Sequence, residues 1–123
     1  MTMLETRIII KNNRGFHVRA AIKFINLANR FAASVKIVKD GNEIDGKNTL
    51  PGDKKEYLAS YPGRLRWNAA NAYVLFGIIG LAVEQGSSIL LRVSGKDEEA
   101  TFKALVDLIN NKFDDEAWDS LLE

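Results

Sequence analysis

The chain has 123 residues, 46% of them hydrophobic and 27% charged, which is the length and composition of one globular domain. It has no cysteine, and this excludes a disulfide framework, thiol catalysis and cysteine metal sites. A formal net charge of +1 gives no overall field that would attract nucleic acid or an anionic membrane. The first residues lack the apolar region of a secretory signal, and no apolar stretch is long enough for direct membrane insertion. We therefore expect a cytoplasmic protein.

The first half of the chain predicts a strand, then a helix, then two more strands. Residues 6–11 are rich in β-branched side chains, which favour a strand. From Val18 the apolar residues recur at helical spacing. Residues 34–38 alternate as a strand does, Asp40-Gly41 is a strong hairpin signal, and 42–45 form the short return strand.

The second half begins with an irregular segment from about residue 48 to 73. It is basic and aromatic and shows no clean period, so a nucleic-acid patch is one interpretation. The balanced charge favours a folded excursion whose aromatic side chains pack on the domain. A short helix is expected from Val74 to a stop at Gly86, then a strand over 88–94, then a helix that starts within 95–99.

The predicted order is β-α-β-β, the irregular segment, then α-β-α. Hairpin-linked strands with interspersed helices are typical of an antiparallel sheet with helices packed on one face. The fold class expected for residues 1–123 is therefore α+β, an open-faced β-sandwich in a single domain.

The motif Gly15-Phe16-His17-Val18-Arg19 lies where a turn meets the start of the first helix. A helix N-terminus has N–H groups without helical partners and a partial positive charge, so it binds anions and disfavours a protonated imidazole. A neutral imidazole is a nucleophile, and a phosphoryl group transferred to His17 could be held by those N–H groups and by the guanidinium of Arg19. The alternative is a histidine that only helps to cap the helix.

Other catalytic motifs have little support. Residues 41–48 resemble a phosphate-binding loop, but Asn48 stands where a hydroxyl should hold magnesium. One histidine without cysteine does not make a typical zinc site, and no Gly-x-Ser-x-Gly turn is present. We expect no metal and no cofactor.

Two blocks of the sequence resemble HPr, the family of histidine-phosphorylated phosphocarriers of the bacterial sugar phosphotransferase system. The first, about 6–48, contains Gly15-Phe16-His17-Val18-Arg19, and the second, about 74–113, contains Gly77-Ile78-Ile79-Gly80-Leu81-Ala82. The resemblance implies a four-stranded antiparallel sheet with three helices on one face, and it makes residues 49–73 an insertion.

The resemblance also implies a function. His17 would accept a phosphoryl group on Nδ1 from phospho-Enzyme I and pass it to an Enzyme II A domain, with Arg19 stabilising it. Val18, Ala20, Leu75 and Phe76 would form the docking surface for these partners. Such a protein is a monomeric carrier for sugar transport and not, by itself, a turnover enzyme.

Three departures leave an alternative open. Ala20 stands where the family usually has proline, and the insertion enters just before the helix on which partners dock. Some family members carry a regulatory serine there, but this chain has Val74 or Asn48, depending on the register. The alternative is a regulatory or binding module whose insert recruits a different protein partner without phosphotransfer. A third interpretation is that exposed aromatic residues of the insert mediate a homo-oligomer.

Overall fold

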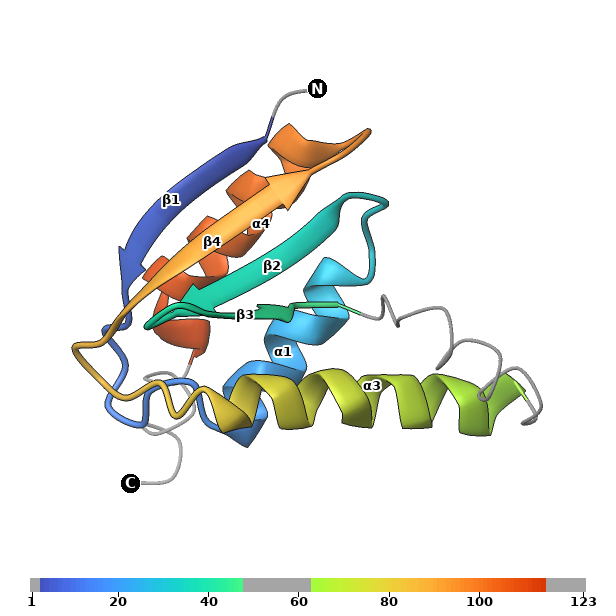
Figure 1. Ribbon diagram of the computed structural model, residues 1–123, viewed down its shortest axis with the longest axis horizontal. Helices are drawn as coiled ribbons and strands as arrows, with labels where there is room; N and C mark the ends of the chain where they lie inside the picture. Colours follow the sequence, from blue (N-terminus) through green and yellow to red (C-terminus); the bar gives the residue numbers. More distant parts are fainter. Residues whose placement is uncertain (1–2, 48–62, 115–123) are drawn as a thin grey trace.

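The computed structural model describes residues 3–47 and 63–114, and the side chains of 3–47 and 72–113. Four strands form one antiparallel sheet in the order β1-β4-β2-β3 (Figure 1). They are β1 (Leu4–Ile9), β2 (Ser34–Lys39), β3 (Asn42–Asp45) and β4 (Ser88–Ser94). The helices are α1 (Val18–Ala28), α3 (Gly63–Gly80) and α4 (Glu98–Asn110), followed by a 3₁₀ turn, Lys112–Asp114. The predicted α+β open-faced β-sandwich is confirmed.

The two faces of the sheet follow from alternation along the strands. In β4, Ile89, Leu91 and Val93 are buried while the residues between them are only half-buried. The buried residues face the helices, and the other face is open (Figure 1). On the open face Arg92 bonds Glu5 at 2.9 Å and Glu43 at 3.1 Å, so one guanidinium links β4 to carboxylates from β1 and β3.

Helix α1 packs against α3 and α4, and much of its buried face is alanine. The buried residues of α1 are Ala20, Ala21, Phe24, Ile25 and Ala28. The three small alanine side chains let α1 lie close to its neighbouring helices, and the buried Phe24 side chain fills the remaining space in the core. The position of α1 is therefore set by a tightly packed surface, which also sets the position of its N-terminal end.

Helix α3 starts earlier than the sequence predicted. A short helix was expected from Val74, but α3 begins at Gly63, so the last part of the irregular segment is helical. Residues 64–73 contain no proline or glycine, and Pro62 precedes the helix, where proline is compatible with a helix start. Residues 48–62, the rest of that segment, lie outside the described residues. Across the described ranges, no helix is both long and apolar enough to cross a bilayer.

The end of α1 is tied to the start of α4 through Asp97. Its carboxylate accepts hydrogen bonds from the N–H groups of Ala32 at 2.9 Å and Ala33 at 2.8 Å, and from the Thr101 hydroxyl at 3.3 Å. These donors hold the pKa of Asp97 below its usual value of 3.8, with the Ala32 bond as the main cause. The ionised carboxylate thus joins the start of α4 to the segment between α1 and β2.

We predict that Asp97→Asn lowers stability at neutral pH and has little effect in acid. Asparagine presents an NH₂ group to one of the two backbone donors, so a hydrogen bond is lost. Because the folded-state pKa is lowered, the contribution of Asp97 is present above its unfolded value and disappears as pH falls through the folded value. Urea unfolding of both proteins at pH 7 and in steps below pH 4 should show the midpoints converging. An equal gap at every pH would contradict this role.

Candidate functional site

His17 is the residue that caps the N-terminus of α1. It has extended backbone angles, φ −77° and ψ 180°, and its carbonyl accepts the Ala21 N–H at 2.8 Å. Its imidazole makes no capping hydrogen bond to the helix, so the backbone alone begins the helix here. The side chain is half-buried. His17 therefore caps the helix through its backbone, and its imidazole takes no part in the capping.

The first turn of α1 has the properties of an anion site. The first bond within the helix is the one from Ala21, so the helix itself supplies no acceptor for the N–H groups of Val18, Arg19 and Ala20. No acidic residue lies in this turn, and the half-buried Arg19 is part of it. The backbone N–H groups of the first turn thus directly follow His17, and Arg19 is two residues further along the chain.

The loop before His17 is held by a tight turn. Gly15 donates its N–H to the Asn12 carbonyl at 3.1 Å, and the Asn12 side chain donates to the Gly15 carbonyl at 2.5 Å. Gly15 has φ +63°, and a Cβ there would lie 2.3 Å from the Val83 carbonyl oxygen. Only glycine allows the two segments this close. The sequence showed the turn but not the segment that packs against it.

Phe16 anchors the same loop to the core. Its N–H donates to the Val83 carbonyl at 2.9 Å, and its ring is 3% exposed. The ring packs edge-on against Phe24, with 5.4 Å between the ring centres, and lies tilted against Phe113 with 5.0 Å between the ring centres. His17 thus follows a residue that is fixed by its backbone and by its side chain.

The four residues expected to dock partners differ in exposure. Val18 is 52% and Phe76 is 72% exposed, whereas Leu75 is half-buried against the core. The side chain of Ala20 is completely buried, so it packs inside the protein and cannot itself touch a partner. Helical periodicity explains the difference, because Val18 points outward and Ala20, two residues further on, turns inward.

Sequence reasoning missed three further exposed apolar side chains on the same two helices. Ile22 on α1 is 44% exposed, and Tyr73 and Ile79 on α3 are 46% and 37% exposed. The signal was available, because Ile22 lies four residues after Val18, and Tyr73 and Ile79 lie three residues on either side of Phe76. Helices α1 and α3 pack against each other, and both expose apolar side chains.

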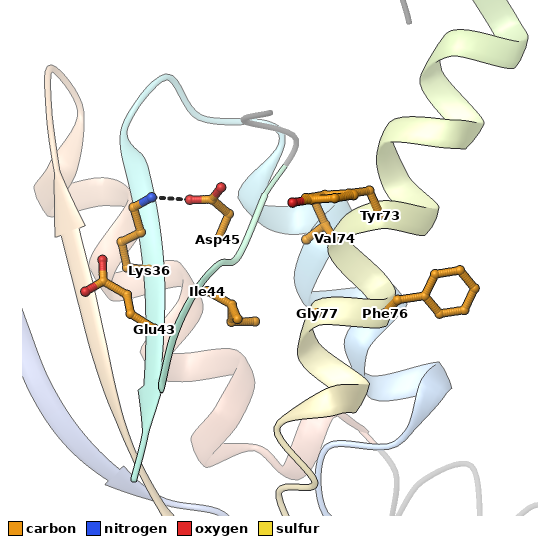
Figure 2. Close-up of a pocket in the computed structure, with 8 residues that line it drawn as sticks. All are labelled: Lys36, Glu43, Ile44, Asp45, Tyr73, Val74, Phe76 and Gly77. Atoms are coloured by element: carbon orange, nitrogen blue, oxygen red, sulfur yellow. Dashed lines mark hydrogen bonds and ion pairs between the residues drawn. The ribbon is translucent and has the colours of Figure 1, made fainter. Parts of the chain in front are cut away.

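A separate groove of about 520 Å³ lies between β3 and α3 (Figure 2). It is lined by Lys36, Glu43, Ile44, Asp45, Tyr73, Val74, Phe76 and Gly77. Ile44 points toward α3, Phe76 points away from β3, and Lys36 is paired with Asp45 across the strands. His17 and Arg19 are not among the residues that line this groove, so it is distinct from the first turn of α1. Within the described residues no cluster of carboxylate and imidazole groups could hold a metal ion.

The family of the chain is shown by comparison with known proteins. The family described as "PTS HPr component phosphorylation site" matches residues 4–51 and 57–111. The matched ranges contain His17, the turn before it and every described helix and strand, and only the final 3₁₀ turn lies outside them. The chain belongs to the HPr family.

Individual relatives agree with this assignment. The chain is 31% identical over 115 residues to the phosphocarrier protein NPr of Shewanella violacea, with 94% of this chain and 98% of that protein covered. It is 30% identical to phosphocarrier protein HPr of Neisseria meningitidis, with 90% and 96% covered. The crystal structure of HPr from Thermoanaerobacter tengcongensis superimposes with a TM-score of 0.66 at 31% identity, with 89% and 94% covered.

We predict that Gly15→Ala destabilises the protein more than Gly41→Ala does. Both glycines have positive φ, a conformation that costs an alanine about 1–2 kcal/mol. At Gly41 nothing lies within 4 Å of the new Cβ, so the backbone cost is the whole effect. At Gly15 the methyl group meets the Val83 carbonyl, and overpacking should add about 1–3 kcal/mol.

Unfolding by guanidinium at pH 7, measured for both variants, gives the comparison. Gly41→Ala is the matched control, because it has the same backbone conformation without the close contact. Equal losses of stability would show that the approach of Gly15 to Val83 does not constrain the loop.

Proposed function

We propose that this protein is a phosphocarrier of the sugar phosphotransferase system. His17 accepts a phosphoryl group on Nδ1 from phospho-Enzyme I and passes it to an Enzyme II A domain. The observation that carries the proposal is the position of His17 at the start of α1, next to backbone donors and Arg19 in a turn without acidic residues. Membership of the HPr family supports it, because the matching region is described by its phosphorylation site.

The chemistry needs little beyond this arrangement. The lone pair of Nδ1 attacks phosphorus, the bond from phosphorus to the donor nitrogen of Enzyme I breaks, and that nitrogen keeps the electron pair. Phosphoryl transfer proceeds through a loose transition state whose charge is spread over three oxygens, so positioning and electrostatic stabilisation dominate. The N–H groups of the first turn and the guanidinium of Arg19 supply both. Imidazole is also a good leaving group, which lets the second transfer proceed by the same route.

The exposed apolar side chains of α1 and α3 suit transient binding of partner proteins. Val18 and Ile22 on α1, with Phe76 and Ile79 on α3, expose apolar area without forming a closed pocket. A phosphoryl donor on another protein must reach the imidazole, and such a surface positions that protein while leaving His17 accessible. Leu75 supports this surface from beneath, since it packs against the core.

Regulation by a serine at the start of the docking helix is not part of the proposal. Val74, one of the two positions compared with that serine, has no hydroxyl and is 2% exposed. Asn48, the other, also has no hydroxyl and lies outside the described residues. The side chains of residues 48–71, including Trp67, also lie outside them, so a role of the expected insertion in partner choice stays a prediction.

We predict that incubation with phosphoenolpyruvate and Enzyme I places an acid-labile phosphoryl group on His17. The adduct should be lost in acid and retained in base, because a phosphoramidate hydrolyses when its nitrogen is protonated. Mass spectrometry of the intact protein, followed by peptide mapping at high pH, identifies the residue.

Two variants test this prediction. His17→Ala should accept no label, and Arg19→Ala should accept it more slowly, because charge stabilisation is lost while the nucleophile remains. Met3→Ala is the control for a surface change, since Met3 is 54% exposed and lies at the beginning of the sheet. An unlabelled wild type, or equal labelling of His17→Ala, would refute the carrier function and favour the binding module.

A further inference from the structure

We propose that Lys39 is a positioning residue for His17, acting from β2 through the segment that joins α3 to β4. The inference rests on the proposed function of His17, because it concerns how that residue is held for transfer. Lys39 does not belong to the anion site, and its ammonium group lies on carbonyls at the end of α3.

The first step is the contact of Lys39 with the end of α3. Its Nζ donates to the Leu81 carbonyl at 3.1 Å and to the Ala82 carbonyl at 2.8 Å. These carbonyls follow the last turn of the helix, where acceptors are left without helical donors and the dipole is negative. A cation from the sheet therefore fixes the point at which α3 ends.

The second step is the backbone of Ala82, which has φ +52°. This left-handed conformation is unfavourable for a residue with a Cβ and persists only where surrounding contacts enforce it. The hydrogen bond from Lys39 to the Ala82 carbonyl is such a contact. Without the ammonium group, the turn at Ala82 loses a contact that holds it in this conformation.

The turn at Ala82 is connected to the loop that carries His17. The residue after Ala82 is Val83, whose carbonyl accepts the Phe16 N–H at 2.9 Å and lies against Gly15. Phe16 is bonded directly to His17. A shift of the Ala82 turn moves the Val83 carbonyl, and the imidazole then moves relative to the first turn of α1. Transfer is sensitive to such displacements, because the reacting atoms must be aligned closely.

Lys47 provides a matched control. It also donates its ammonium group to carbonyls beyond a helix end, those of Phe31 and Ala33 after α1. Those carbonyls follow the C-terminal end of α1, whereas His17 is at the N-terminal end. Removing either lysine removes one cation from one helix end, but only Lys39 is connected to the loop of His17.

The experiment compares Lys39→Met, Lys39→Arg and Lys47→Met with the wild type. Amide hydrogen exchange of Phe16, followed by NMR, reports the bond to Val83. The rate of phosphoryl transfer from saturating phospho-Enzyme I reports the alignment of His17. In Lys39→Met the Phe16 amide should exchange faster and transfer should be slower, each by about twofold to fivefold, the factor that a cation at a helix C-terminus is usually worth.

Lys39→Arg should restore both values, because a guanidinium also donates to two carbonyls. Lys47→Met should change neither, whatever its effect on overall stability. If Lys39→Met matches the wild type in both measurements, or if Lys47→Met changes them equally, the positioning role is overturned. If the wild type takes no phosphoryl group, the proposed function fails, and the Phe16 exchange rates alone then decide whether Lys39 holds the loop.

Discussion

The hydrogen bond from the Phe16 N–H to the Val83 carbonyl is the interaction on which the site depends. It joins the loop before α1 to the segment after α3, and it forms because Gly15 has no side chain to keep the two apart. The Phe16 ring then enters the core between Phe24 and Phe113. His17 follows directly, so its position is fixed by packing while its imidazole stays half-buried at the surface.

Much of this fold could be predicted from local patterns. The strand 42–45 follows from Asp40-Gly41, where Asp40 and Gly41 both adopt positive φ, and the strand 88–94 follows from alternation. The position of His17 at a helix start was also clear, since the period changes at Val18. The early start of α3 at Gly63 could not be predicted by periodicity, because the helix is long and has no clear apolar stripe along its first part.

The contacts that position the site are tertiary, and no local rule reveals them. Lys23, Lys39 and Lys47 donate to carbonyls near the C-terminal ends of α4, α3 and α1, respectively. In the sequence each is one lysine among many on predicted surfaces. In the structure each lysine donates hydrogen bonds to carbonyls that have no donor within the helix. The lysine and its carbonyl partners are far apart along the chain, so local patterns do not reveal the contact. The burial of Ala20 was not predicted either. It directly follows the motif and was expected to contact partners, but its side chain is buried in the core.

The central claim is that the first turn of α1 receives the phosphoryl group carried by His17. The most direct measurement is an NMR comparison of the ¹⁵N-labelled protein before and after phosphorylation by Enzyme I. The account predicts phosphorus coupling to Nδ1 of His17 and downfield shifts of the amide protons of Val18, Arg19 and Ala20, with little change at Gly95, which follows β4 and lies against Ala33. Phosphorylation that leaves those three amides unshifted, or that occurs on another residue, would contradict it.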